Sequence, residues 1–132
     1  MKFINRKSEL EALNEKWESG DPQMVILYGK RRVGKTELMK QFGKKKPFVY
    51  FLADKRNQIE QLREFGRIVG EFSRYTVLVQ HGFTDWIEAF QYLKNLNKQF
   101  VLAVDEYPYL VESDPATSSL FQKGWDVYLK ES

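Results

Sequence analysis

The chain has 132 residues, of which 42% are hydrophobic and 30% charged, so its length and composition suit one globular domain or part of one. No apolar run approaches the ~18 residues of a membrane-spanning helix, and the N-terminus lacks the apolar segment of a signal peptide, so we expect no membrane anchor. The absence of cysteine excludes disulfides and thiolate metal sites and fits a reducing cytoplasm. The net charge of +3 does not by itself indicate a nucleic-acid partner.

The first part of the chain predicts an amphipathic helix within residues 1–20, because Leu10, Leu13 and Trp17 recur at spacings of three and four. The turn residues that follow it, glycine, aspartate and proline at 20–22, end this segment.

A strand is predicted over residues 24–28 and a helix over about 35–43, with a glycine-containing loop between them. The loop from Gly29 to Thr36 reads GKRRVGKT and matches G-x-x-x-x-G-K-[ST], the pattern of a phosphate-binding P-loop. The strand before it and the helix after it are the context that this pattern requires. The alternative, a basic turn between a strand and a helix, explains neither glycine.

The residue types of this loop suit a triphosphate. Gly29 and Gly34 lack Cβ atoms, so the backbone can take positive φ values and approach the phosphates. Amides of the loop and of the following helix would point at the anion, where the helix dipole also favours negative charge. Lys35 would neutralise the β- and γ-phosphates, and the Thr36 hydroxyl would bind Mg²⁺. The expected nucleotide-binding residues are Gly29, Lys30, Arg31, Arg32, Val33, Gly34, Lys35, Thr36 and Glu37.

The middle of the chain alternates predicted strands and helices. The apolar run 48–52 predicts a parallel strand buried on both faces. Helices are predicted over about 56–73 and 84–96, whereas 75–79 is either a short strand or an extension of the first helix. The apolar stripes of both helices are expected in the core. They comprise Ile59, Leu62, Phe65, Val69 and Phe72 in the first helix, and Trp86, Ala89, Phe90, Leu93 and Leu96 in the second.

A third apolar strand over residues 100–104 ends in the acidic pair Asp105-Glu106. An acidic turn after a strand is common, but downstream of a P-loop, with strand and helix units between, it predicts the second half of a nucleotide site. Asp105 would hold Mg²⁺ through water, and Glu106 would orient and deprotonate the attacking water. Further on, Asp114-Pro115 predicts the start of a last helix.

Four segments of the chain together resemble the archaeal-type ATPases, a family that belongs with the AAA+ and STAND branches of the P-loop NTPases. They are Phe3-x-Asn5-Arg6-x-x-Glu9-Leu10, the P-loop, Val104-Asp105-Glu106-Tyr107-Pro108-Tyr109-Leu110 and Leu120-Phe121-x-x-x-Trp125-Asp126. The resemblance covers essentially the whole chain. It implies an α/β fold with a three-layer P-loop NTPase core, in which helices flank a parallel sheet, and ATP and Mg²⁺ as cofactors. It also implies that Asn5 and Arg6 lie near the adenine.

Compared with that family, the chain stops before a further strand that carries a polar sensor residue, so residues 1–132 are expected to be a partial P-loop ATPase domain. In related folds the missing strand lies between the P-loop strand and the strand of the acidic pair. Three outcomes follow: the two strands pair directly, a partner chain supplies the strand, or the piece is marginally stable alone. Unpaired edges of strands 24–28 and 100–104 would invite self-association.

The leading functional hypothesis is ATP binding, with Mg²⁺-dependent hydrolysis in the full-length family member. Lys35 and Glu106 would be catalytic, and Thr36 and Asp105 would hold the metal. No lid, sensor or arginine finger is identifiable, and because an arginine finger alone is worth about 10³–10⁵ in rate, we expect weak or absent turnover from this chain by itself. The alternatives are a small-molecule kinase on the same fold and a non-enzymatic module for nucleic acid or protein. A DNA partner of the full-length protein follows from family analogy alone.

Overall fold

The computed structural model describes residues 46–124 continuously and, before them, residues 14, 15, 17, 18, 20, 23–26, 41, 43 and 44. Residues 14, 15, 17 and 18 are helical, as are 41 and 43; the rest of the helices predicted within 1–20 and 35–43 lies outside the described residues. The strands are β1 (Gln23–Ile26), β2 (Phe48–Leu52) and β3 (Val101–Asp105). The helices are α3 (Gln58–Ser73), α4 (Thr76–His81), α5 (Trp86–Asn95), α6 (Pro108–Ser113) and α7 (Thr117–Gly124).

The three strands form one parallel sheet in the order β1-β3-β2. Ile26 of β1 lies opposite Val104 of β3, and Leu52 of β2 lies opposite Asp105. Both edges of β3 are therefore paired, and all five of its residues are buried. Direct pairing of β1 with β3 is the first of the three outcomes considered above, and the expectation of unpaired backbone at strand 100–104 is wrong. The predicted α/β class with a parallel sheet is confirmed.

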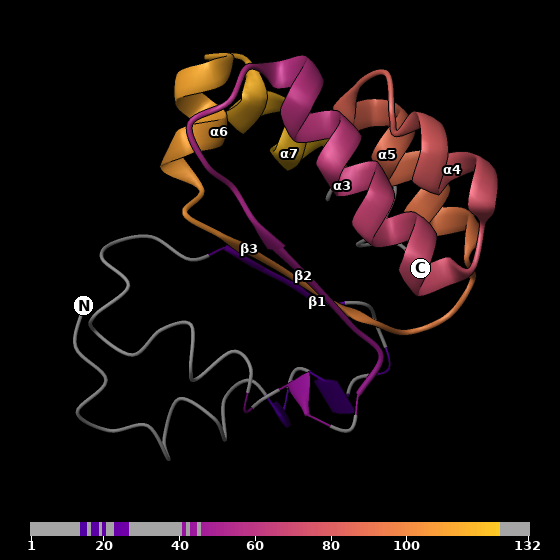
Figure 1. Ribbon diagram of the computed structural model, residues 1–132. Coiled ribbons are helices and arrows are strands. Elements are labelled where there is room, and N and C mark those ends of the chain that lie inside the picture. The colour runs from indigo at the N-terminus through magenta and orange to yellow at the C-terminus, as the bar shows by residue number, and fades with distance from the viewer. Residues whose placement is uncertain are drawn as a thin grey trace.

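The five helices α3 to α7 lie on one face of this sheet (Figure 1). Because side chains alternate along a strand, Val49 and Phe51 of β2 point toward these helices and are buried. On the other face, Phe48 and Tyr50 are half-buried and Leu52 is exposed. The prediction that the run 48–52 is buried on both faces is therefore wrong. β2 is the edge strand of the described sheet and is covered from fewer sides than the central strand β3.

Helix α3 is capped at both ends and covers the sheet with an apolar stripe. At its start, the Asn57 side chain accepts a hydrogen bond from the Glu60 backbone N–H at 2.9 Å. The predicted core residues Leu62, Phe65 and Val69 are buried, whereas Ile59 is 70% exposed. The prediction for Ile59 is wrong because this residue lies in the first helical turn, on the flank of the buried stripe.

Residues 75–79 form neither a strand nor an extension of the preceding helix, because α3 ends at Ser73 and a separate helix, α4, begins at Thr76. α4 packs closely on α3 through glycines. A Cβ added to Gly66 of α3 would lie 2.4 Å from the Cα of Gly82, which follows α4. A Cβ added to Gly70 would lie 2.8 Å from the backbone N of Val79. The two segments can approach this closely because neither glycine carries a side chain.

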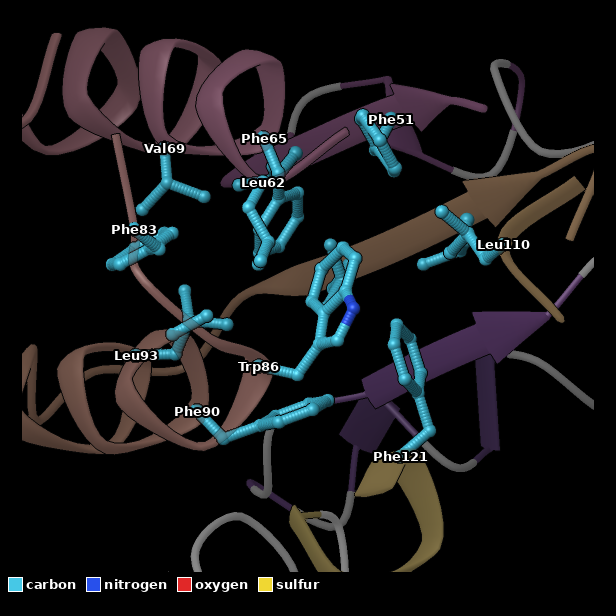
Figure 2. Close-up of a cluster of buried hydrophobic side chains, with 14 of the residues drawn as sticks. Phe51, Leu62, Phe65, Val69, Phe83, Trp86, Phe90, Leu93, Leu110 and Phe121 are labelled. Atoms are coloured by element: carbon cyan, nitrogen blue, oxygen red, sulfur yellow. The ribbon is translucent and has the colours of Figure 1, made fainter. Parts of the chain in front are cut away.

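Trp86, the first residue of α5, lies at the centre of the hydrophobic core, where Figure 2 shows it among side chains from the sheet and helices. Its ring centroid lies 5.4 Å from that of Phe65 in α3, 5.0 Å from Phe121 in α7 and 6.4 Å from Phe51 in β2. The core predicted for the second helix is confirmed for Trp86, Ala89, Phe90 and Leu93, and Leu96 packs against it half-buried.

The chain after β3 contains α6, a short helix that the sequence pattern did not predict. Pro108 occupies its first turn, where a missing N–H carries no cost. The last helix, α7, begins at Thr117 and not at Pro115, because the Asp114 carboxylate accepts a hydrogen bond from the Ala116 N–H at 3.0 Å and forms a turn first. In the described part of the chain, no helix has the length and apolar character needed to cross a membrane.

Replacing Gly66 with alanine should destabilise the fold, because the new methyl group would overlap the backbone at Gly82. Overpacking of this kind costs about 1–3 kcal/mol, and the gain in helix propensity returns up to about 1 kcal/mol. Chemical denaturation followed by circular dichroism measures the difference. The control Gln80→Ala, at an exposed position of α4, should change the unfolding free energy by less than about 0.5 kcal/mol. Equal stability of Gly66→Ala and wild type would contradict the close approach of α3 and α4.

Candidate nucleotide site at the carboxyl edge of the sheet

Asp105 is the last residue of β3 and lies at the carboxyl edge of the sheet, where it is 4% exposed. The register pairs Tyr50 with Ala103 and Leu52 with Asp105, so these side chains share the sheet face opposite to the described helices. In open α/β sheets, ligands bind outside the carboxyl ends of the strands. The position of Asp105 is therefore the one that a ligand-binding carboxylate would need.

Hydrogen bonds hold the Asp105 carboxylate in place. Its Oδ1 accepts from the backbone N–H of Glu106 at 2.8 Å, and its Oδ2 accepts from the Tyr50 hydroxyl at 2.5 Å. The main-chain carbonyl of Asp105 accepts from the N–H of Ala53 at 3.0 Å. The acidic residue at the end of β3 is thus fixed by two residues from β2 and the loop after it, and by its own neighbour.

Glu106 has a backbone conformation that is unusual for its residue type. Its φ is 57°, in the left-handed region, which costs a residue with a side chain roughly 1–2 kcal/mol. Its carbonyl accepts a hydrogen bond from the Tyr109 N–H at 3.0 Å, so the turn leads directly from β3 into α6. Strained backbone of this kind gathers at functional sites, where the surrounding structure maintains it.

β1 ends at the same edge of the sheet. Ile26 lies opposite Val104, the residue before Asp105, and the sequence continues from Ile26 into the P-loop pattern. Of the predicted site residues, the structure places Asp105 and Glu106 side by side at this edge. The predicted nucleotide-binding residues Asn5, Arg6, Gly29, Lys30, Arg31, Arg32, Val33, Gly34, Lys35, Thr36 and Glu37 lie outside the described residues.

A pocket of about 270 Å³ adjoins Tyr50 at the outer side of β2. Its lining combines polar and charged side chains with Leu52 and Ile68. Two of the lining carboxylates form ion pairs: Asp54 with Arg56 at 2.9 Å, and Glu64 with Arg67 at 2.6 Å. The hydrogen bond from Arg67 lowers the pKa of Glu64 below its ordinary value, so Glu64 is ionised at neutral pH. The pocket is lined by Tyr50, Leu52, Asp54, Arg56, Gln61, Glu64 and Ile68.

The loop between β2 and α3 is hydrogen-bonded to α3 and within itself. Gln61, a buried residue of α3, donates its side-chain amide to the carbonyl of Asp54 at 2.6 Å. The N–H of Arg56 donates to the same carbonyl at 2.9 Å. Residues of this loop also line a second pocket of about 250 Å³, which is lined by Lys55, Arg56, Tyr109, Glu112 and Ser113.

Asp105 suits a hard cation such as Mg²⁺, which prefers oxygen ligands and retains several waters. A carboxylate can accept about four hydrogen bonds, and two of those at Asp105 come from Tyr50 and Glu106. Within the described ranges, no group of three or more histidine, aspartate or glutamate side chains could bind a metal. A metal at Asp105 would therefore need further oxygens, of the kind that the Thr36 hydroxyl and nucleotide phosphates supply.

Sequence reasoning did not identify Tyr50 as a member of this site. One signal was present, because a tyrosine in an otherwise apolar strand has a hydroxyl that needs a hydrogen-bonding partner when it is buried. The identity of that partner depends on strand order and register, which follow from the pairing of β2 with β3.

Two substitutions at Glu106 distinguish the effect of its backbone conformation on stability from the effect of its carboxylate. Glu106→Gly should leave the free energy of unfolding within about 1 kcal/mol of wild type, because glycine adopts positive φ readily but raises the entropy of the unfolded chain. Glu106→Val should lower it by about 1–2 kcal/mol, because a β-branched residue at positive φ is strained. Both variants lack the carboxylate, so a difference in urea denaturation reports the backbone. Equal stabilities would contradict the left-handed conformation.

Comparison with known proteins gives a family match over nearly the whole chain. A family model described as an ATPase domain predominantly from Archaea matches residues 3–130. An uncharacterized protein of Methanocaldococcus jannaschii is 30% identical over 130 residues, which are 98% of this chain and 27% of that protein. An uncharacterized ATP-binding protein of the same organism is 58% identical over 40 residues, 30% of this chain and 68% of that protein.

The chain thus spans about a quarter of the first of these relatives. No solved structure was found to match it. The family match agrees with an α/β fold whose parallel sheet carries an acidic residue at its carboxyl edge. The chain belongs to the family of ATPase domains found predominantly in Archaea.

Proposed function

We propose that the chain binds ATP and Mg²⁺ at the carboxyl edge of its sheet, and that the full-length protein hydrolyses the nucleotide. The observation that carries the proposal is the parallel pairing of β1 with β3. It puts the strand that precedes the P-loop sequence beside the strand that ends in Asp105 and Glu106. The family and the name of the ATP-binding relative support ATP as the nucleotide.

Each predicted residue has a role in this proposal. The amides of Gly29–Glu37 would surround the phosphates, and Lys35 would neutralise their charge. Thr36 and Asp105 would hold Mg²⁺, Asp105 through a water molecule; when bound, the metal neutralises charge that develops on the β- and γ-phosphates. Asn5 and Arg6 would lie near the adenine.

Glu106 would act as the general base that orients and deprotonates the attacking water. Its position directly after Asp105 favours hydrolysis over transfer to a small-molecule acceptor, because a second carboxylate is then available for water. The left-handed backbone of Glu106 and the hydrogen bond from Tyr109 to its carbonyl limit the directions that its side chain can take.

Residues 1–132 by themselves would bind nucleotide and turn it over slowly. Catalysis of phosphoryl transfer is mainly positioning and electrostatic stabilisation, and an arginine finger contributes about 10³–10⁵ in rate. We assign the sensor, the lid and the arginine finger to other parts of the full-length protein, which agrees with a relative of which this chain covers 27%.

Replacing Lys35 with alanine should weaken MgATP binding about 10–100-fold, because one hydrogen-bonded charge contact of about 1.5–3 kcal/mol is lost. Isothermal calorimetry measures the affinity. The control Lys123→Ala removes an exposed lysine of α7 and should bind MgATP like the wild type. Equal affinities of Lys35→Ala and wild type would refute the phosphate site.

Replacing Glu106 with glutamine should leave MgATP affinity unchanged and slow single-turnover hydrolysis about 10²–10⁴-fold, because glutamine cannot accept a proton from water. The measurement uses excess protein over labelled ATP, so that slow turnover is detectable. The control Glu112→Gln changes an exposed carboxylate of α6 and should hydrolyse ATP at the wild-type rate. Equal rates for Glu106→Gln and wild type would exclude Glu106 as the base.

A further inference from the structure

We propose that Tyr50 is a positioning residue of the magnesium site, whose hydroxyl orients the Asp105 carboxylate toward the metal of bound MgATP. The inference rests on the proposed function and adds a residue that lies outside the P-loop and the acidic pair. Tyr50 comes from β2, the strand on the far side of β3 from β1.

The contact itself is specific. The Tyr50 hydroxyl donates to Oδ2 of Asp105 at 2.5 Å, while the backbone N–H of Glu106 donates to Oδ1 at 2.8 Å. Two donors on different oxygens fix the plane of the carboxylate as well as its position, because a rotation about the Cβ–Cγ bond breaks both bonds. The orientation of the Asp105 carboxylate is thereby set.

The Tyr50 ring is itself held in place. Its centroid lies 6.3 Å from that of Phe48, with an angle of 21° between the two ring planes. The register puts Tyr50 opposite Ala103, whose small side chain leaves room for the ring to reach along the face of β3 to Asp105. Phenylalanine would pack in the same place, so the hydroxyl supplies the contact to Asp105 and the ring supplies the packing.

A carboxylate that holds a metal through a water molecule depends on such partners for its orientation. Residues that hydrogen-bond to metal ligands orient them, and their loss typically reduces metal affinity or activity about 10–100-fold. In a purely structural role, Tyr50 would only supply a hydrogen bond to the carboxylate of Asp105, a residue that is 4% exposed. The two roles differ in one measurable property, because a positioning residue changes the effect of Mg²⁺ on ATP binding and a structural residue does not.

The test measures ATP affinity by calorimetry twice for each protein, with saturating Mg²⁺ and with EDTA. Tyr50→Phe should reduce the Mg²⁺-dependent tightening of ATP binding by about tenfold or more and leave the affinity in EDTA unchanged. In the Asp105→Asn background, the same substitution should have no further effect on the tightening, because the carboxylate that it positions is absent.

Tyr92→Phe is the matched control. It removes the same atom, a half-buried hydroxyl that shares a hydrogen bond with Ser73 at 2.6 Å, between α5 and α3. It should bind ATP like the wild type under both conditions. Thermal unfolding of all variants confirms that each is folded under the conditions of the titration.

The outcomes are distinct. If wild type and Tyr50→Phe show equal tightening by Mg²⁺, the role of Tyr50 is refuted and the proposed function stands. If Tyr50→Phe weakens ATP binding equally with Mg²⁺ and with EDTA, Tyr50 is structural and the inference is again refuted. If neither the wild type nor Lys35→Ala binds MgATP, both the proposed function and the inference are refuted.

Discussion

The described structure depends on the parallel ladder that β3 forms with β1 on one side and β2 on the other. This central position buries all five residues of β3, including an aspartate at its end. A carboxylate so far removed from water requires hydrogen-bond donors, and the neighbouring strand and the following residue supply them. The same ladder brings the end of the strand before the P-loop sequence to the edge where Asp105 lies.

One face of the sheet forms the hydrophobic core, and the other carries residues of the candidate site. The helices α3 to α7 cover one face, where Trp86 links aromatic rings from the sheet and from two helices. The opposite face carries Tyr50 and Asp105. Because consecutive residues of a strand point to opposite faces, Phe51 belongs to the core while its neighbour Tyr50 belongs to the candidate site. The core therefore fixes the strand positions from which the site is built.

Local sequence signals predicted the elements that long apolar patterns define. β2, α3, α5 and β3 lie where their apolar residues and caps indicated, within a few residues. The six-residue α6 is too short for a periodic pattern, and its Tyr107-Pro108 start resembles a turn. Tyr50 could not be assigned to Asp105, because their contact depends on the register of two strands that are distant in sequence. The predicted direct neighbours of the phosphates lie outside the described residues, so their arrangement stays a prediction.

The attachment of the loop after β2 has a mechanical consequence. The main-chain carbonyl of Asp105 accepts a hydrogen bond from the N–H of Ala53. The carbonyl of Asp54, which follows Ala53, accepts a hydrogen bond from the side chain of Gln61 in α3. Two hydrogen bonds and one peptide unit thus connect Asp105 to α3, the longest helix described. Gly66 of this helix lies against the backbone of Gly82, directly after α4. A displacement of the Asp105 backbone along its strand would strain these hydrogen bonds. We therefore expect α3, supported by α4, to resist such a displacement.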